Sequence, residues 1–425
     1  VIGAPYLLMV DGVVFNHLWF NTASVMATMP LTNIERIEFV YGPASSVYGA
    51  NAFMGVINVI TRKDVKGNGM FSNTRLSATT NKGYTGDVNL FYKKNDIRVS
   101  LTMRLENDDV GDWDIHNNYE WTKDKYYADR SLWGGFVDNQ NIAGEFSSPI
   151  RHRAVDLRGF FGGIEIAAQY FSLNSGYGFS YPADKGLPNA TWIREEYSLY
   201  LRNEFSITDK ISSSTLFRYR ESNVPGHSYF VEAYGNPRVI DYSYWLALSN
   251  SWSIFQNFEA IISDSFSVLT GLKYERKDLQ KAYNINYSAA LTPDMVDAAT
   301  FPFPEILSSD ILESYNRIET DDLGFFMQAK YNINKNHHLN LGIRVDDNSV
   351  YGTATTLRAG YVGKFNKFIF KALYGEAFQE PNPRVLYGGW TGSGSDPDLK
   401  PEKSKTLEFS LNYTAGKFSH LLSLY

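Results

Sequence analysis

The sequence predicts an all-β membrane protein, in which a transmembrane antiparallel β-barrel follows a small mixed domain. Three observations favour this fold class. From Gly69 onward the hydrophobic pattern has a period of two, as in strands whose two faces meet different surroundings. Short connections alternate with long ones along the chain, as in transmembrane barrels. Aromatic residues make up 15% of the chain although its mean hydropathy is −0.29, which fits strands with one apolar and one polar face.

The composition excludes several classes of protein. The 425 residues include 40 Lys and Arg against 46 Asp and Glu, and the net charge of −6 gives no reason to expect a nucleic-acid partner. The chain has no cysteine, which excludes disulfides, cysteine-ligated metal sites, iron–sulfur clusters and thiol catalysis. No stretch approaches the roughly 18 consecutive apolar residues of a transmembrane helix. A transmembrane β-barrel is still allowed, because its signal is alternation rather than bulk hydropathy.

Residues 1–65 differ from the rest of the chain and predict the small mixed domain. Their apolar runs are short and are broken by Gly and Pro. Between residues 34 and 62 the order of residues indicates a strand, a turn at Gly42-Pro43, a short helical turn and a second strand. Ser45 and Ser46 are the expected caps of that helical turn, and Gly49 is expected to end it.

Residues 66–425 predict the strands of the barrel. Apolar residues alternate strictly with polar residues in segments such as 97–106, 339–346 and 406–413. We count about fifteen strand-like segments by this criterion. The polar face is expected to line the lumen, with these residues pointing inward: Arg98, Arg104, Arg202, Glu204, Gln328, Lys330, Arg344, Asp346 and Glu408.

The connections between these strands discriminate between a membrane barrel and a large soluble sandwich or propeller. Short connections include 94–96, 208–210 and 365–367, whereas long ones cover 108–152, 176–193, 222–240, 280–320 and 380–401. Propeller repeats have near-equal spacing, and these spacings are irregular. Soluble sandwiches seldom place charged residues so regularly opposite an apolar face. The pattern therefore favours the membrane barrel.

A long ordered string of residues, from Ile34 to Arg62, closely resembles the end of the plug domain of TonB-dependent outer-membrane receptors. Val10-Asp11-Gly12-Val13 resembles a turn of the same domain. Tyr41 departs from the family pattern, which more often has Arg or Lys before Gly-Pro. Three later stretches, 341–352, 371–382 and 396–404, are similar to barrel strands and loops of that family. The resemblance covers nearly the whole chain.

The resemblance implies a 22-stranded antiparallel transmembrane β-barrel with a small α+β plug domain inside its lumen. Residues 1–65 are then the C-terminal part of the plug, and residues 66–425 form an incomplete barrel with about fifteen of the strands. Further strands are expected beyond Tyr425, and the segment that TonB binds is expected before Val1. The implied location is the outer membrane of a Gram-negative bacterium, where lipid surrounds the barrel.

The function implied by the resemblance is import of a scarce nutrient, with energy that TonB transmits from the inner membrane. The expected small-molecule ligand is a ferric siderophore, with cobalamin or another metal chelate as alternatives. Uptake of a carbohydrate or peptide and signalling are alternatives within the family, and a passive porin-like channel is the alternative outside it. We expect no enzyme and no cofactor. The sequence has neither a His-Glu-x-x-His nor a Gly-x-Ser-x-Gly motif, and it predicts no catalytic residue and no metal site.

The segment that follows the Asp-Gly-Val turn is the first candidate site, because similar receptors place a ligand-facing plug loop there. Its mixture of aromatics, amides and one histidine suits a rigid, partly polar ligand. The expected ligand-binding residues are Phe15, Asn16, His17, Trp19 and Asn21. The alternative is that Leu18, Trp19 and Phe20 pack the plug against the barrel.

A second set of charged residues is expected to form ion pairs between the plug and the barrel wall. Buried charges at that boundary would make the plug removable. The set is Glu35, Arg36, Glu38 and Arg62.

Overall fold

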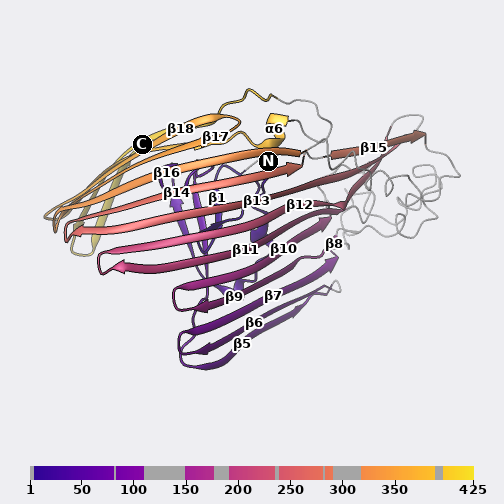
Figure 1. Ribbon diagram of the computed structural model, residues 1–425, viewed down its shortest axis with the longest axis horizontal. Coiled ribbons are helices and arrows are strands. Elements are labelled where there is room, and N and C mark those ends of the chain that lie inside the picture. The colour runs from indigo at the N-terminus through magenta and orange to yellow at the C-terminus, as the bar shows by residue number, and fades with distance from the viewer. Residues whose placement is uncertain are drawn as a thin grey trace.

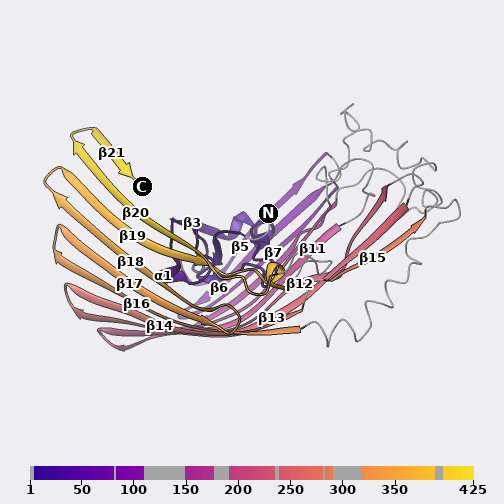
Figure 2. The same cartoon turned by 90° about the horizontal axis from the view of Figure 1, so that it is seen from above.

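The fold is described from a computed structural model of the chain. The structure describes residues 4–80, 83–109, 149–176, 191–234, 239–280, 283–290, 317–387 and 396–425. These residues form a small plug and a large antiparallel sheet, the wall, which curves around the plug (Figures 1 and 2).

The plug is built on a four-stranded sheet with the order β2-β1-β4-β3. The central pair, β1 and β4, is parallel, whereas β2 and β3 each pair antiparallel with their neighbour. The elements of the plug are β1 (Leu7–Val10), β2 (Val13–Val14), the 3₁₀ turns η1 (Ser24–Thr28) and η2 (Leu31–Asn33), β3 (Ile34–Tyr41), α1 (Ser45–Tyr48) and β4 (Gly55–Thr61). The predicted order of strand, turn, helical turn and strand is therefore present.

Glycine is required where β4 begins. Gly55 has a φ of +150°, and a Cβ placed on it would lie 2.2 Å from the carbonyl oxygen of Val40 on the neighbouring strand. Gly42, at the turn that leaves β3, has a φ of +82° but open space around it. Of these two glycines, Gly55 is the one that combines a positive φ with a close approach of the neighbouring backbone.

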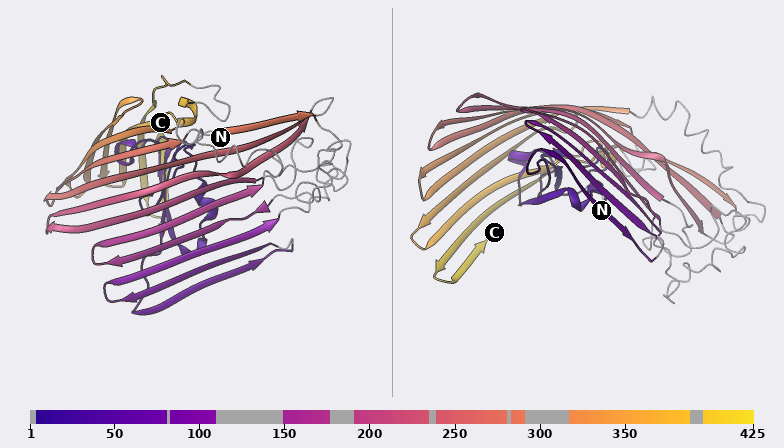
Figure 3. Two further views of the ribbon diagram at one scale, coloured as in Figure 1. Left: turned by 45° about the vertical axis from the view of Figure 1, so that its right-hand side comes forward. Right: turned by 90° about the horizontal axis from the view of Figure 1, so that it is seen from below.

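The wall consists of antiparallel strands, most of which pair with the next strand in the sequence. Its strands are β5 (Gly69–Ala78), β6 (Tyr84–Lys94), β7 (Ile97–Asp109), β8 (Pro149–Ile150), β9 (Arg153–Phe161), β10 (Ile164–Gly176), β11 (Thr191–Thr208), β12 (Ile211–Tyr234), β13 (Val239–Ser263), β14 (Phe266–Gln280), β15 (Tyr283–Ala290), β16 (Arg317–Asn334), β17 (His337–Asn348), β18 (Gly352–Phe365), β19 (Phe368–Gln379), β20 (Glu402–Ala415) and β21 (Phe418–Leu424). The helix α6 (Pro383–Tyr387) follows β19. Tight turns join neighbouring strands at one end of the wall (Figure 3), where Asn95, Asn366 and Gly416 have positive φ.

The described wall contains more strands than the alternation indicated. The segments from β5 to β21 number seventeen, against a prediction of about fifteen. The additional strands, β8 and β15, lie inside the connections predicted at 108–152 and 280–320. β15 pairs with the end of β13, beyond the part of β13 that pairs with β14, so it lengthens the sheet instead of adding a full crossing.

The predicted alternation of the wall strands is present in the structure. On β7 the apolar Val99, Met103 and Leu105 are exposed on the outer face, whereas Ser100 and Thr102 are buried on the face toward the plug. Among the predicted inward residues, Gln328 and Arg344 are likewise buried. Within the described ranges, no helix is long and apolar enough to span a membrane.

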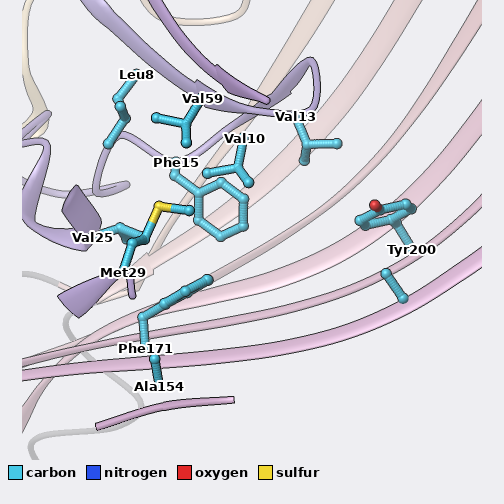
Figure 4. Close-up of a cluster of buried hydrophobic side chains, with 11 residues drawn as sticks. Leu8, Val10, Val13, Phe15, Val25, Met29, Val59, Ala154, Phe171 and Tyr200 are labelled. Atoms are coloured by element: carbon cyan, nitrogen blue, oxygen red, sulfur yellow. The ribbon is translucent and has the colours of Figure 1, made fainter. Parts of the chain in front are cut away.

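The plug packs against the inner face of the wall through a mixed hydrophobic cluster. Leu8, Val10, Phe15 and Met29 of the plug meet wall residues that include Phe171 (Figure 4). The rings of Phe15 and Phe171 are 5.4 Å apart, edge to face. The plug sheet ends at Thr61 and the wall begins at Gly69, so the predicted boundary between residues 65 and 66 lies in the connection between them.

Candidate ligand cavity and plug attachment

A cavity of about 420 Å³ lies between the plug and the inner face of the wall. The plug lines it with Leu7 and Met9 of β1 and with three further segments: the turn at residues 11–14, the loop at residues 16–21 and the turn at residues 47–51. Strands β11 to β14, β16 and β17 supply the opposite side, together with the residues that follow β19. Cavities of this size hold small-molecule ligands.

The lining of the cavity carries charges of both signs in equal number. The basic residues are Arg202, Arg218, Arg220, Lys273, Lys277 and Arg344, and the acidic residues are Asp11, Glu204, Glu275, Asp322, Asp346 and Glu380. Several of them are paired: Lys273 with Glu275 at 2.8 Å, and Arg220 with Glu275 at 3.3 Å. The cavity is therefore polar without a dominant sign of charge.

Asp11 makes the most buried ionic contact between the plug and the wall. It occupies the turn between β1 and β2 with a φ of +51°, and its side chain is fully buried. Its carboxylate pairs with Arg158 of β9, and it accepts hydrogen bonds from the hydroxyl of Thr61 at 2.7 Å and from the Thr61 N–H at 3.1 Å. Burial raises the pKa of the Asp11 carboxyl, but Arg158 and Lys63 outweigh burial and hold that pKa below its ordinary value of 3.8. Asp11 is therefore ionised and binds the plug to the wall.

Arg158 is held in place by further wall residues. It donates two hydrogen bonds to the carboxylate of Asp156, at 2.7 and 2.6 Å. Arg202 of β11 adds a second link to the turn by donating to the Asp11 carbonyl oxygen at 2.9 Å, and it pairs with Glu165 at 3.0 Å. These side chains form one ionic cluster, in which Asp11 is anchored from two wall strands.

The opposite side of the plug is attached to the segment around the end of β19. Ser45 lies against Phe378, whose N–H donates to the Ser45 hydroxyl at 3.1 Å. The side chain of Asn51 donates to Glu380 at 2.7 Å, and the Glu380 N–H donates back to the Asn51 amide oxygen at 3.2 Å. Asn382 donates to the carbonyl oxygen of Phe20 at 3.1 Å. These contacts and the Asp11 cluster therefore fasten the plug on two sides of the cavity.

All five residues of the predicted ligand loop are buried in the structure: Phe15, Asn16, His17, Trp19 and Asn21. Phe15 belongs to the cluster of Figure 4 and also lies under the guanidinium of Arg218, 4.7 Å from its ring centre. Trp19 packs with Leu18, Phe20 and the wall residues Val224, Ala247 and Leu279. Packing of the plug against the wall, which the sequence analysis gave as the alternative, is therefore observed for Leu18, Trp19 and Phe20.

Only three of these five residues line the cavity, namely Asn16, His17 and Asn21. The side chain of Asn16 accepts from the Leu8 N–H at 2.8 Å and donates to Asn21 at 2.9 Å, which fixes the loop internally. Ligand binding by the loop stays a prediction.

His17 organises the loop as a neutral ring. Its Nδ1 accepts hydrogen bonds from the N–H groups of Trp19 and Phe20, at 3.1 and 3.3 Å. Burial lowers the pKa of His17 well below its ordinary value of 6.5, and the nearby Arg194 and Arg220 lower it further. An unprotonated Nδ1 is required by these two accepted bonds.

The predicted plug–wall ion pairs differ from the observed ones. Arg36 pairs with Glu35 at 3.1 Å and with Glu38 at 2.8 Å, all on the exposed surface of β3. Residues two apart on a strand share a face, so Arg36 finds its partner within its own strand. Arg62 is exposed. In the part of the chain that the structure describes, the ionic contacts from residues 1–65 to the wall come instead from Asp11, from Lys63, which lies 3.7 Å from Glu165, and from Asp64, which lies 2.7 Å from Lys93 of β6.

Three further wall residues contact the plug without having been predicted to do so: Arg158, Arg218 and Arg220. Arg218 donates to the Val14 carbonyl oxygen, and Arg220 donates to that of Asn16 at 2.9 Å. Both lie on the inward face of β12, and the alternation of that strand could have identified them as lumenal. No group of three or more potential metal-ligating side chains occurs among the described residues.

Two models of one protein family match the chain. The model described as "TonB dependent receptor-like, beta-barrel" matches residues 214–425, and the "TonB-dependent Receptor Plug Domain" matches residues 3–56. The first lies within the wall, and the second covers most of the plug.

Solved structures with the same fold include two siderophore receptors and a metal transporter. The siderophore receptor PirA from Acinetobacter baumannii is 15% identical with a TM-score of 0.60, and the match covers 99% of this chain and 62% of that one. PirA from Pseudomonas aeruginosa is 13% identical with a TM-score of 0.62, over 99% and 65%. The copper transporter OprC is 13% identical with a TM-score of 0.62, over 99% and 63%. The chain therefore spans less than two thirds of these structures, and at such identities the likeness establishes the fold.

Proposed function

Because this chain belongs to the TonB-dependent receptor family, we propose that it works as an outer-membrane receptor that imports a scarce nutrient. Energy would reach the plug from the inner membrane through TonB, and lipid of the outer membrane of a Gram-negative bacterium would surround the wall. The family consists of receptors and transporters rather than enzymes.

One observation carries the proposal: a buried plug, fastened to the wall on two sides, borders a polar cavity. The Asp11 cluster holds one side of the plug, and the contacts of Asn51 and Phe20 hold the other. Such a plug obstructs the lumen until work is done on it, because several buried polar contacts must break together. A passive pore has no need of this arrangement.

The proposed ligand is a small metal chelate, with a ferric siderophore as the first candidate and cobalamin or another chelate next. Asn16, His17 and Asn21 are the plug residues proposed to face it, since they line the cavity. The equal number of acidic and basic lining residues suits a ligand that presents both hydrogen-bond donors and acceptors. Two of the similar structures are siderophore receptors, which supports this order of candidates.

The test is uptake by whole cells that carry the intact gene, compared with a deletion strain. Labelled ferric siderophores and cobalamin are offered with and without a protonophore. We expect accumulation of one ligand that the protonophore abolishes. Accumulation that ignores the protonophore would support a passive channel, and no accumulation of any chelate would refute this ligand class and leave carbohydrate, peptide or signalling as the role.

A further inference from the structure

A second, smaller cavity lies beside the first and shares part of its lining. Its volume is about 30 Å³, against about 420 Å³ for the first, and we call the two the outer pocket and the inner cavity. Five residues line both of them and thus separate one from the other: Leu18, Lys277, Tyr351, Glu380 and Pro383. We call these five residues the partition.

The two cavities lie at different depths along the wall. Two residues that line the inner cavity lie near the short turns. Leu216 lies five residues after the start of β12, roughly 16 Å along the strand. Asn257 lies six residues before the end of β13, roughly 20 Å along the strand. Lys277 of the partition lies eleven residues after the start of β14, roughly 36 Å from the turn that precedes it. The outer pocket adds Leu386 and Tyr387 of α6. The inner cavity therefore extends from the partition toward the short turns, and the outer pocket lies on the side of the long connections.

The partition is held by charged and polar contacts around Glu380. The Nζ of Lys277 lies 3.4 Å from Glu380 and 2.8 Å from Asp322. The hydroxyl of Tyr351 donates to Glu380 at 3.3 Å. Lys277 and Tyr351 are both buried, so these contacts form away from bulk water, where they are stronger than at a surface.

The plug keeps this segment in position. Asn51 exchanges two hydrogen bonds with Glu380, and Asn382 donates to the carbonyl oxygen of Phe20. Displacement of the plug breaks these three bonds, whereas the contacts of Glu380 with Lys277 and Tyr351 lie within the wall and can persist. The partition is thus coupled to the plug through hydrogen bonds that plug movement must break.

We propose that the partition is the outer gate of a polar passage along the wall and that Glu380 is the residue that closes it. When the plug moves, Glu380 loses Asn51, the segment after β19 shifts, and the outer pocket joins the inner cavity. The solutes that fit are polar and carry groups of both signs, because acidic and basic side chains line the space behind the gate in equal number. This inference rests on the proposed import function, since it assumes that a solute crosses the barrel.

The absence of cysteine from the chain makes an accessibility test direct. A single cysteine is introduced either at Ser253, which lines the inner cavity, or at Val350, which lines the outer pocket. Intact cells without an energy source are treated with a bulky maleimide that does not cross the outer membrane. The measured quantity is the rate of maleimide labelling at Ser253→Cys divided by the rate of labelling at Val350→Cys.

Glu380→Ala is expected to raise this ratio about tenfold, which corresponds to a loss of about 1.4 kcal/mol in the free energy of closure. Glu319→Ala is the matched control, because Glu319 pairs with Arg276, next to Lys277, but lies on the exposed side of the strands. It is expected to leave the ratio unchanged. Tyr351→Phe removes only the hydroxyl contact and is expected to give a smaller rise.

An unchanged ratio in Glu380→Ala, with the receptor present at the parent level in the outer membrane, would overturn the proposal. If Glu380→Ala does not reach the membrane, an unchanged ratio in Tyr351→Phe overturns the proposal instead. The labelling needs neither ligand nor energy, so its outcome is independent of the uptake experiment. A gate that opens in a receptor that imports no chelate would refute the proposed ligand class and leave the gate standing.

Discussion

Replacing Asp11 with alanine tests whether the buried ionic cluster attaches the plug to the wall. Removing one partner of a buried ion pair costs about 3–5 kcal/mol. Asp11→Ala belongs at the low end, about 3 kcal/mol, because Arg158 keeps two short hydrogen bonds to Asp156 and is not left unpaired. The Thr61 N–H and hydroxyl lose their shared acceptor, which accounts for part of the cost.

Hydrogen exchange of the detergent-solubilised receptor, followed by mass spectrometry, measures this loss. A weakening of about 3 kcal/mol is expected to speed exchange roughly 100-fold in the peptides that contain β1 and β4. Arg36→Gln is the control, because its ion pairs are exposed and are expected to contribute little. If Asp11→Ala speeds exchange of these peptides no more than Arg36→Gln does, the buried cluster does not attach the plug to the wall.

Further predictions concern pH, packing and backbone conformation. The pKa of the Asp11 carboxyl is held below 3.8, so the contribution of Asp11 to plug stability is complete well above that pH and is lost only as the pH falls through the lowered pKa. Hydrogen exchange of the plug, corrected for the intrinsic exchange rate at each pH, is therefore expected to be constant from about pH 8 to 7. His17 stays neutral in the folded chain while the unfolded chain binds a proton below 6.5, so the loop is expected to weaken as the pH falls below 6.5. His17→Asn, which retains an acceptor, is expected to abolish that change in exchange of residues 15–21. Phe15→Ala is expected to destabilise the plug by about 3–5 kcal/mol, measured as a lower urea midpoint for plug exchange. Gly55→Ala is expected to make the plug sensitive to added protease, whereas Gly42→Ala, with open space around it, is expected to cost only about 1 kcal/mol and to leave the plug resistant.

The wall could be predicted from the sequence because its signal is local. A strand between lipid and lumen must alternate, and Val99, Ser100 and Thr102 show that the structure follows this pattern. β15 was not predicted, because its residues read as part of a long connection; among the described residues it pairs with Val239–Leu246 of β13. The alternation of residues identifies a strand that has one apolar and one polar surrounding. It does not indicate with which neighbouring strand a short segment such as β15 will pair.

The plug attachment could be predicted only in part, because its partners are far apart in the sequence. Asp11 was visible as a turn residue, but nothing near it indicates a partner 147 residues away in Arg158. Glu35, Arg36 and Glu38 were expected to form ion pairs with the wall. Arg36 pairs instead with Glu35 and Glu38, its neighbours on the same strand. The loop at residues 15–21 contains groups that suit both a ligand and a packed interface, and only the fold determines which side chains lie on the cavity.

The parallel pairing of β1 with β4 has a mechanical consequence. Four register pairs join the two strands, from Leu7–Val56 to Val10–Val59. A load that enters before β1 and leaves after β4, toward the wall, pulls these strands past one another along their length. All the hydrogen bonds between them then bear the load at once, and a slide of about 3.3 Å, one residue, removes every one of them from register. Extraction of this sheet is therefore expected to have a threshold force and a single rupture, rather than the gradual peeling of a hairpin that is opened from its end.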